Sequence, residues 1–272
     1  MHTYDPIEHS IQAVTPTLCK LLGVSSPTLC KASPLENICQ QAQEIFHGDH
    51  AQKCLIFAPD ALGNHLSHTT PLFFETVRHL APMVVSLRSV VPPKTPVCFA
   101  SMFTGAPPAY HGIRKYEKPV LSCDTLFDAL LRADKRVAIV AVKDCSVDRI
   151  FRGRNLDYFS EPYDPDVTLR ALSLLKENHH DVIVAYHQEY DDTLHATTPF
   201  APEAIQAARK HLEEFVKLSE AVDRYWQSYH RIISFTPDHG AHISPTTGKG
   251  DHGEDIPEDM ELMHFYGIRR RG

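Results

Sequence analysis

The sequence predicts an α/β protein in which helices cover both faces of a mostly parallel central sheet. Short β-branched runs alternate along the chain with segments of helical periodicity. These runs are apolar on both faces, as is typical of strands buried between two helical layers. No internal repeat, low-complexity tract or flexible linker divides the chain, so we expect a single domain over residues 1–272.

Each expected strand ends in a polar or glycine-containing turn. The strands are expected at 53–60, 83–90, 136–142, 181–186, 231–238 and 262–268. Helices are expected between them at 124–134, 166–179 and 202–230. Residues 1–50 lack a clear strand and predict a helical N-terminal extension, with helices at 9–24 and 37–46.

The composition argues against highly charged partners. The 272 residues carry a formal net charge of -7, whereas nucleic acids and anionic membranes attract basic surfaces. No apolar run approaches the roughly 20 residues of a membrane span, and the first residues lack the pattern of a signal peptide. We therefore expect a cytoplasmic protein that binds neither nucleic acid nor membrane. Seven cysteines without a Cys-x-x-Cys pair predict reduced core residues instead of a disulfide framework.

Acidic residues stand at the ends of three expected strands. Asp60, Asp191 and Asp238 each lie at, or shortly after, the end of such a strand. In an open parallel sheet, ligands bind beyond the carboxyl ends of the strands. We therefore expect these three carboxylates, which come from distant parts of the chain, to meet at one edge of the sheet.

Two further features indicate a ligand at this edge. Asp191 and His195 are four residues apart, which places both on one face of a helical turn, either as a solvated pair or as joint ligands of a cation. A helix is expected over 96–105, with Pro96 at its first position. Thr95 would then be the N-cap, where amide donors favour an anion. Taken alone, Thr95 would be an ordinary cap.

The tripeptide Asp-His-Gly occurs twice near the end of the chain, at residues 238–240 and 251–253. The repetition has two interpretations, a polar loop that is rich in histidine or half of a metal site. Histidine nitrogens and carboxylate oxygens are ligands that suit zinc or manganese. The tripeptides alone do not decide between the two interpretations.

Four stretches of the chain occur in the order of the site motifs of a known family. They are FAPDALG (57–63), KTPVCFASMFTGAPPAYHGI (94–113), YDDTLH (190–195), and TPDHG followed by GDHGEDIPEDMELMHFYGI (236–268). They resemble the alkaline phosphatase superfamily of two-metal enzymes, which includes nucleotide pyrophosphatases/phosphodiesterases, phosphopentomutase and cofactor-independent phosphoglycerate mutase. The resemblance extends over residues 53–268, and it implies a single α/β metallohydrolase domain with an alkaline-phosphatase-like core.

The resemblance implies a role for each candidate residue. Thr95 would be the nucleophile. The implied metal ligands are Asp60, Thr95, Asp238 and His239 for one ion, and Asp191, His195 and His252 for the other. The implied cofactors are two divalent metal ions, Zn or Mn, and the implied partner is a small phosphorylated substrate that Lys94 and Cys98 contact. Asp251 has no role in the family pattern and is expected to be a solvated turn residue.

Two departures from the family pattern leave the ester class open. Cys98 stands where diesterase members usually have Asn, and Ala61 follows the first metal-binding Asp where Gly is common. The expected activity is hydrolysis of phosphate esters through a Thr95 phosphoenzyme, by a phosphodiesterase/nucleotide pyrophosphatase or a phosphomonoesterase.

Other activities remain as alternatives. Mutase members carry a cap domain between the nucleophile and the Asp-x-x-x-His element, but residues 96–190 already contain expected core elements. Hydrolysis is therefore favoured over a phosphomutase-like phosphotransferase. A catalytically weak metal-binding scaffold of the same fold stays open, and so does the oligomeric state, including a homodimer. Sulfatase chemistry is disfavoured, because KTPVCF lacks the Cys/Ser-x-Pro-x-Arg order.

Overall fold

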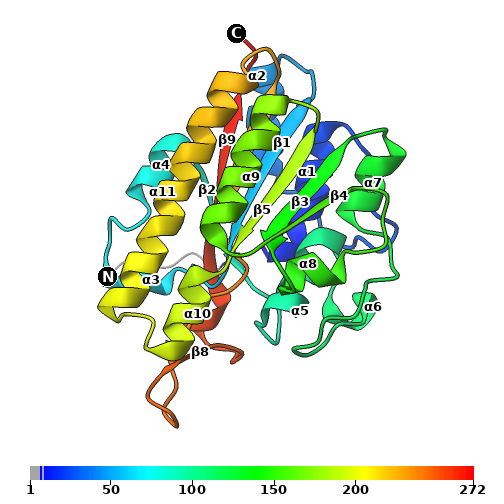
Figure 1. Ribbon diagram of the computed structural model, residues 1–272. Coiled ribbons are helices and arrows are strands. Elements are labelled where there is room, and N and C mark those ends of the chain that lie inside the picture. The colour runs from blue at the N-terminus through cyan, green and yellow to red at the C-terminus, as the bar shows by residue number, and fades with distance from the viewer. Residues whose placement is uncertain (1–6, 8) are drawn as a thin grey trace.

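A computed structural model describes residue 7 and residues 9–272, in which a seven-stranded sheet has helices on both faces (Figure 1). The strand order is β2-β9-β6-β1-β5-β3-β4. The strands are β1 (Lys53–Pro59), β2 (Met83–Arg88), β3 (Val137–Val142), β4 (Asp157–Glu161), β5 (Val182–His187), β6 (Arg231–Phe235) and β9 (Glu261–Arg269). β1 lies at the centre, and all of its residues are buried. A separate two-stranded sheet consists of β7 (His242–Ile243) and β8 (Gly250–Asp251).

The strand directions confirm the predicted α/β fold class with a mostly parallel sheet. β1 pairs in parallel with β5 and β6, and β3 pairs in parallel with β4 and β5. β9 runs antiparallel to both of its neighbours, β2 and β6. Because β9 reverses the direction between them, β2 points the same way as the parallel strands. The carboxyl ends of β1, β2, β3, β5 and β6 therefore lie at one edge of the sheet.

The six expected strands are confirmed to within a few residues at each end. β4 was not expected, because its sequence DYFSE has two adjacent aromatic residues between polar ones and lacks an apolar run. It is the outermost strand and each of its residues is at least partly exposed, so burial imposes little hydrophobic pattern on it. The expected strands β1, β3, β5 and β6 are detectable because they are buried throughout, and β2 and β9 are partly buried.

Helices α9 (Asp164–Glu177) and α11 (Pro202–Tyr225) cover one face of the sheet, and α1 (Val14–Leu22) and α2 (Glu36–Phe46) lie on the other (Figure 1). The predicted helices are thus present, including those in the described part of residues 1–50. The shorter helices are α3 (His65–Thr69), α4 (Glu75–Leu80), α5 (Thr95–Thr104), α6 (Pro108–His111), α7 (Leu126–Arg132), α8 (Ser146–Ile150), α10 (Glu189–Ala196) and α12 (Pro257–Met260). Within the described chain, no helix is both long enough and apolar enough to cross a membrane.

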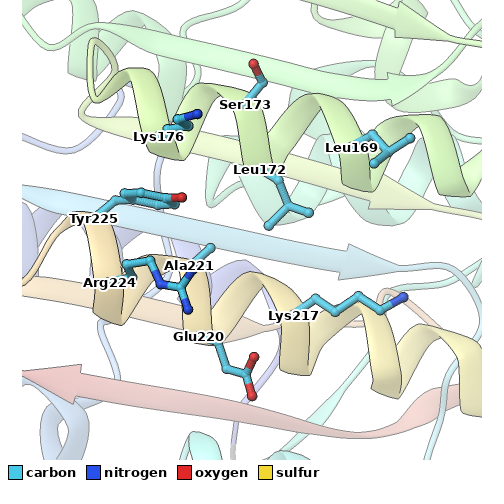
Figure 2. Close-up of a pocket in the computed structure, with 9 residues that line it drawn as sticks. All are labelled: Leu169, Leu172, Ser173, Lys176, Lys217, Glu220, Ala221, Arg224 and Tyr225. Carbon is cyan, nitrogen blue, oxygen red and sulfur yellow. The ribbon is translucent and has the colours of Figure 1, made fainter.

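A groove of about 480 Å³ runs between α9 and α11 (Figure 2). Leu169 and Leu172 contribute apolar surface to it, and Lys176, Lys217 and Arg224 contribute positive charge. One carboxylate, that of Glu220, lies among these cations. The groove lies on the helical face of the molecule, so it is distinct from the edge where the carboxyl ends of the strands meet.

A substitution in the central strand β1 tests the described core. The Phe57 ring is fully buried in β1, with ring centroids 4.7 Å from His187, 5.6 Å from Phe215 and 5.5 Å from Phe235. We expect Phe57→Ala to lower the free energy of unfolding by about 3–5 kcal/mol, because it leaves a cavity between the sheet and α11. Urea unfolding followed by circular dichroism measures this, and Leu169→Ala in the exposed groove is the control, with a change within about 0.5 kcal/mol. Equal effects of the two substitutions would contradict the described core.

Candidate metal centre

The structure brings the three strand-end carboxylates together. Asp60 follows β1 directly, Asp238 follows β6, and Asp191 lies in α10 after β5. These three strands are parallel neighbours, so their carboxyl ends coincide. α5, which begins at Thr95, and α10 and β8 lie at this same end of the sheet (Figure 1). The geometry therefore agrees with the edge that the sequence indicates.

The first cluster of ligand-type atoms consists of Asp60, Asp238 and His239. Its members offer carboxylate and imidazole atoms within 4.8 Å of one another. The His239 Nε2 lies 3.3 Å from Asp60 Oδ1 and 3.3 Å from Asp238 Oδ2. The Thr95 hydroxyl oxygen lies 3.4 Å from the same nitrogen. All four side chains are buried, so a cation at this point would have little contact with bulk water.

The second cluster consists of Asp191, His195 and His252. Asp191 Oδ1 lies 3.5 Å from the Nε2 atom of each histidine. The ring of His252 stacks on the ring of His239 with a centroid distance of 3.9 Å, so the two clusters adjoin. The second Asp-His-Gly tripeptide therefore contributes a histidine to the site and is not a remote polar loop.

One oxygen of each carboxylate is left without a partner. Among the described residues, Asp60 Oδ1, Asp191 Oδ1 and Asp238 Oδ2 are buried and have no hydrogen-bond partner. Two of the carboxylates are held through their other oxygen, since the Tyr186 hydroxyl donates to Asp60 Oδ2 and the Ala61 amide donates to Asp238 Oδ1 at 3.3 Å. Buried polar atoms are ordinarily paired, because an unpaired one costs free energy. The free oxygens are the same atoms that face the histidine nitrogens, as metal ligands would.

The pKa values of these side chains are shifted in the direction that disfavours their charged forms. Burial raises the pKa of Asp60, Asp191 and Asp238 well above the usual range, and the neighbouring carboxylates raise it further. Burial also lowers the pKa of His239, and it lowers the pKa of His252 to about 3. Neutral imidazole is the form that binds metals, and a bound cation favours ionised carboxylates. The donor set therefore fits divalent cations.

All three histidines have the same hydrogen-bond pattern. Nδ1 bonds a backbone carbonyl in each, that of Gly240 for His239 (3.0 Å), Gly250 for His195 (3.1 Å) and Pro93 for His252 (2.8 Å). A carbonyl oxygen only accepts, so Nδ1 must carry the hydrogen. In a neutral ring this leaves the Nε2 lone pair free and directed at the carboxylates. Such an arrangement fixes the tautomer of metal-binding histidines.

The two glycines of the Asp-His-Gly tripeptides are required for different reasons. A Cβ on Gly240 would lie 2.0 Å from the Glu258 carbonyl oxygen, so only glycine permits this close approach. Gly253 has a φ of +126°, and a Cβ there would lie 2.4 Å from Lys94 Cε. Glycine accepts both positions because it lacks a Cβ. Each turn thereby presents its histidine to the site.

Thr95 is not the helix cap that the sequence predicted. Lys94 occupies the N-cap position, and Thr95 is the first helical residue, with Pro96 second. Proline is tolerated throughout the first turn, so its presence does not fix the start of a helix to one residue. The Thr95 hydroxyl is therefore directed toward His239 and does not cap α5.

Neither of the two expected substrate contacts is free to meet a substrate in this structure. Cys98 is buried, and Lys94 is engaged in other interactions. Cys98 is fully buried, and its Sγ lies 3.2 Å from the Ser89 hydroxyl, which donates to the Asp238 carbonyl at 2.7 Å. Cys98 thus lies behind Asp238. Lys94 Nζ donates to the His252 carbonyl and lies 3.7 Å from Asp251 Oδ1, so Asp251 has an ion-pair partner. Lys94 supports the loop that carries His252.

A polar pocket of about 130 Å³ opens beside Thr95. Its lining includes Asp60, Thr95, Tyr116, Lys118, Lys143, Asp144, Cys145, Ser146, Tyr186, Gln188, Asp191 and Asp192. Its two lysines, Lys118 and Lys143, were not among the site residues expected from the sequence. Lys143 directly follows β3 and was accessible to the same strand-end argument as Asp60, whereas Lys118 lies in a segment without regular structure. Lys118 Nζ donates to the Asp144 carbonyl at 3.0 Å, which holds this cation at the pocket.

Solved structures share this fold. The chain is similar to phosphonoacetate hydrolase from Sinorhizobium meliloti 1021 in complex with phosphonoformate, with a TM-score of 0.52 and 18% identity over 70% of the chain and 57% of the other. It is also similar to murine ectonucleotide pyrophosphatase/phosphodiesterase 5, with a TM-score of 0.57 and 16% identity over 72% of the chain and 59% of the other. These likenesses confirm the α/β fold that was expected from the sequence motifs. The chain spans less than two thirds of either protein. No family model matches the chain, and no curated protein matches it.

The second cluster gives a test of metal binding. We expect His252→Ala to weaken the binding of Zn²⁺ or Mn²⁺ by more than about 100-fold. Loss of a group that only orients a metal ligand already lowers metal affinity by roughly 10–100-fold, and here the ligand itself is lost. Isothermal titration calorimetry measures this affinity. Binding should recover in part at high metal concentration, since Asp191 and His195 remain.

The matched control is His79→Ala, because His79 is exposed on α4. His242 is unsuitable, since its Nδ1 lies 2.8 Å from the buried Asp259 carboxylate. Equal metal affinities of the His252→Ala and His79→Ala variants would show that the second Asp-His-Gly is only a turn.

Proposed function

We propose that the chain is a two-metal phosphohydrolase that cleaves small phosphate esters through a phosphoenzyme on Thr95. The observation that carries the proposal is the position of the Thr95 hydroxyl, which lies 3.4 Å from His239 in the first cluster and lines the polar pocket. A nucleophile needs both features, since activating groups must adjoin it and a substrate must reach it.

The proposed cofactors are two divalent cations, Zn²⁺ or Mn²⁺. Asp60, Asp238, His239 and Thr95 would hold one ion, and Asp191, His195 and His252 the other. Two such ions carry four positive charges and the three carboxylates remove three, which leaves about one positive charge for an anionic phosphoryl group. When bound, the ions would lower the pKa of the Thr95 hydroxyl and neutralise charge on the phosphoryl oxygens.

The residues of the chain supply orientation for the reaction. Thr95, fixed at the first helical position of α5, would attack the phosphorus in line with the ester oxygen that leaves. Lys118 and Lys143 would attract the anionic substrate to the pocket and orient it there. The leaving alcohol would depart through the pocket, and water would then hydrolyse the phosphothreonine.

The arrangement of the chain between Thr95 and Asp191 supports hydrolysis over phosphotransfer. This segment forms β3, β4, β5 and helices α6 to α9, most of which belong to the central sheet or its helical layers. The pocket is therefore left without a cap domain drawn from this segment. Water can reach the phosphothreonine, so release of phosphate is the expected outcome.

The neighbouring structures also support the proposal. One is described as a phosphonoacetate hydrolase, and another as a pyrophosphatase/phosphodiesterase in an inactive threonine-to-alanine form in complex with AMP. A threonine is thus important for activity in a protein of this fold. We propose phosphodiester, pyrophosphate and phosphomonoester groups as the range of substrates to be compared.

Removal of the nucleophile is the direct test. We expect Thr95→Ala to reduce hydrolysis of p-nitrophenyl phosphate or bis-p-nitrophenyl phosphate by several orders of magnitude, because the attacking oxygen is lost. Released p-nitrophenol measures the activity with Zn²⁺ and with Mn²⁺. The Thr95→Ser variant is the control and should retain part of it. Inactivity of the unaltered chain across a panel of metals and esters would favour the scaffold alternative.

If the lysines of the polar pocket bind the substrate, their removal should raise KM. We expect Lys143→Gln to raise KM by about tenfold or more with a smaller change in kcat, since a hydrogen bond to a charged group contributes about 1.5–3 kcal/mol. Steady-state kinetics on the best ester from the panel measures both constants. Lys176→Gln removes the same charge from the groove between α9 and α11 and should leave KM unchanged (Figure 2). An equal KM in both variants would remove Lys143 from the binding site.

A further inference from the structure

We propose that Asp259 is a positioning residue that fixes the two Asp-His-Gly turns relative to each other, an inference that rests on the proposed two-metal site. Asp259 lies in the short helix α12, and its side chain is fully buried. It lies within the stretch GDHGEDIPEDMELMHFYGI, but the resemblance implied no role for it. Its hydrogen bonds reach residues next to both His239 and His252.

The side chain of Asp259 bonds the second turn. Its Oδ2 accepts the backbone amides of Gly253 at 2.8 Å and Glu254 at 2.9 Å, which directly follow His252. Its Oδ1 accepts from His242 Nδ1 at 2.8 Å. Both carboxylate oxygens are therefore paired, in contrast to the carboxylates of the two clusters. Hydrogen bonds to an ionised carboxylate are stronger than those between neutral groups.

The backbone of Asp259 bonds the first turn. Its carbonyl oxygen accepts the Gly240 amide at 2.8 Å, and Gly240 directly follows His239. The β7–β8 ladder pairs His242 with Asp251, so the residue that bonds Asp259 Oδ1 also lies opposite the second turn. One residue thus connects the chain immediately after each histidine.

This connection bears on metal binding because the two histidines must be placed accurately. The rings of His239 and His252 are stacked at 3.9 Å, and each Nε2 faces the carboxylates of a different cluster. A metal site requires ligand atoms within a few tenths of an ångström of their preferred positions. The side-chain carboxylate of Asp259 fixes the backbone beside His252, and its backbone carbonyl fixes the backbone beside His239.

The Asp259→Asn variant tests the carboxylate and leaves the carbonyl bond to Gly240 in place. An amide of the same shape has one acceptor oxygen and no charge, so the bonds to Gly253, Glu254 and His242 lose the added strength that an ionised carboxylate gives them. We expect Zn²⁺ or Mn²⁺ affinity to fall by about 10–100-fold, as is typical when a group that orients a metal ligand is removed. Isothermal titration calorimetry on the folded variant measures it, and kcat should recover at saturating metal.

A double-mutant cycle separates positioning from a general loss of stability. If Asp259 acts through His252, Asp259→Asn should weaken metal binding far less in the His252→Ala background than in the unaltered chain. Additive losses in the cycle would overturn the inference. Where Asp259→Asn yields too little folded protein, Asp259→Ser is titrated in its place, and the same non-additivity is expected.

The matched control is Asp181→Asn at the opposite edge of the sheet. Asp181 also accepts a backbone amide, that of Arg136 at 2.9 Å, and lies 3.3 Å from Lys53 Nζ. This variant should lose stability while its metal affinity stays unchanged. Unchanged metal affinity in Asp259→Asn, in a chain that otherwise binds metal, would overturn the positioning role alone. Failure of the unaltered chain to bind either metal would overturn the proposed function as well.

Discussion

The constraint on which the site depends is the burial of three carboxylates within reach of one another. Asp60 and Asp238 belong to one cluster and Asp191 to the next, and each keeps a buried oxygen without a partner among the described residues. Burial and mutual repulsion raise the pKa of all three, so this part of the molecule is poorly suited to its own negative charge. Divalent cations bound there would offset this penalty, so metal binding would stabilise this edge of the sheet.

The surrounding groups pair the atoms that face away from the clusters. Tyr186 holds the outer oxygen of Asp60, and backbone carbonyls hold Nδ1 of all three histidines. A further chain of bonds connects the segment after His239 with Tyr190, the residue before Asp191. The Ala241 amide donates to His65 Nδ1 at 3.4 Å, His65 Nε2 donates to the Tyr190 hydroxyl at 2.9 Å, and that hydroxyl donates to a backbone carbonyl. The atoms that we propose as metal ligands are therefore the ones left without other hydrogen bonds, and the surrounding bonds hold them in place.

The features of the site that follow from strand burial and strand direction were predictable from the sequence. β1 and β6 were detectable because they are apolar on both faces, and the residues that end them, Asp60 and Asp238, then had to share an edge. β4 escaped detection because a partly exposed edge strand needs no apolar run. Asp259 and Lys118 were not accessible to such reasoning, since nothing in a local pattern shows which carboxylate meets two backbone amides from another segment, or where an irregular segment brings a lysine.

The two Asp-His-Gly tripeptides show why identical residues need not have identical roles. In both, the histidine donates Nδ1–H to a backbone carbonyl and directs Nε2 into the site. Asp238, however, lies at the end of a central strand, where it is fully buried and keeps one oxygen free. Asp251 lies in the outlying β8, where its side chain is 49% exposed and pairs with Lys94. Solvent can screen the charge of Asp251 but not that of Asp238, so of the two only the ionised Asp238 carboxylate would be stabilised strongly by a neighbouring cation. The position of each tripeptide in the fold, and not its sequence, therefore determines which aspartate can serve as a metal ligand.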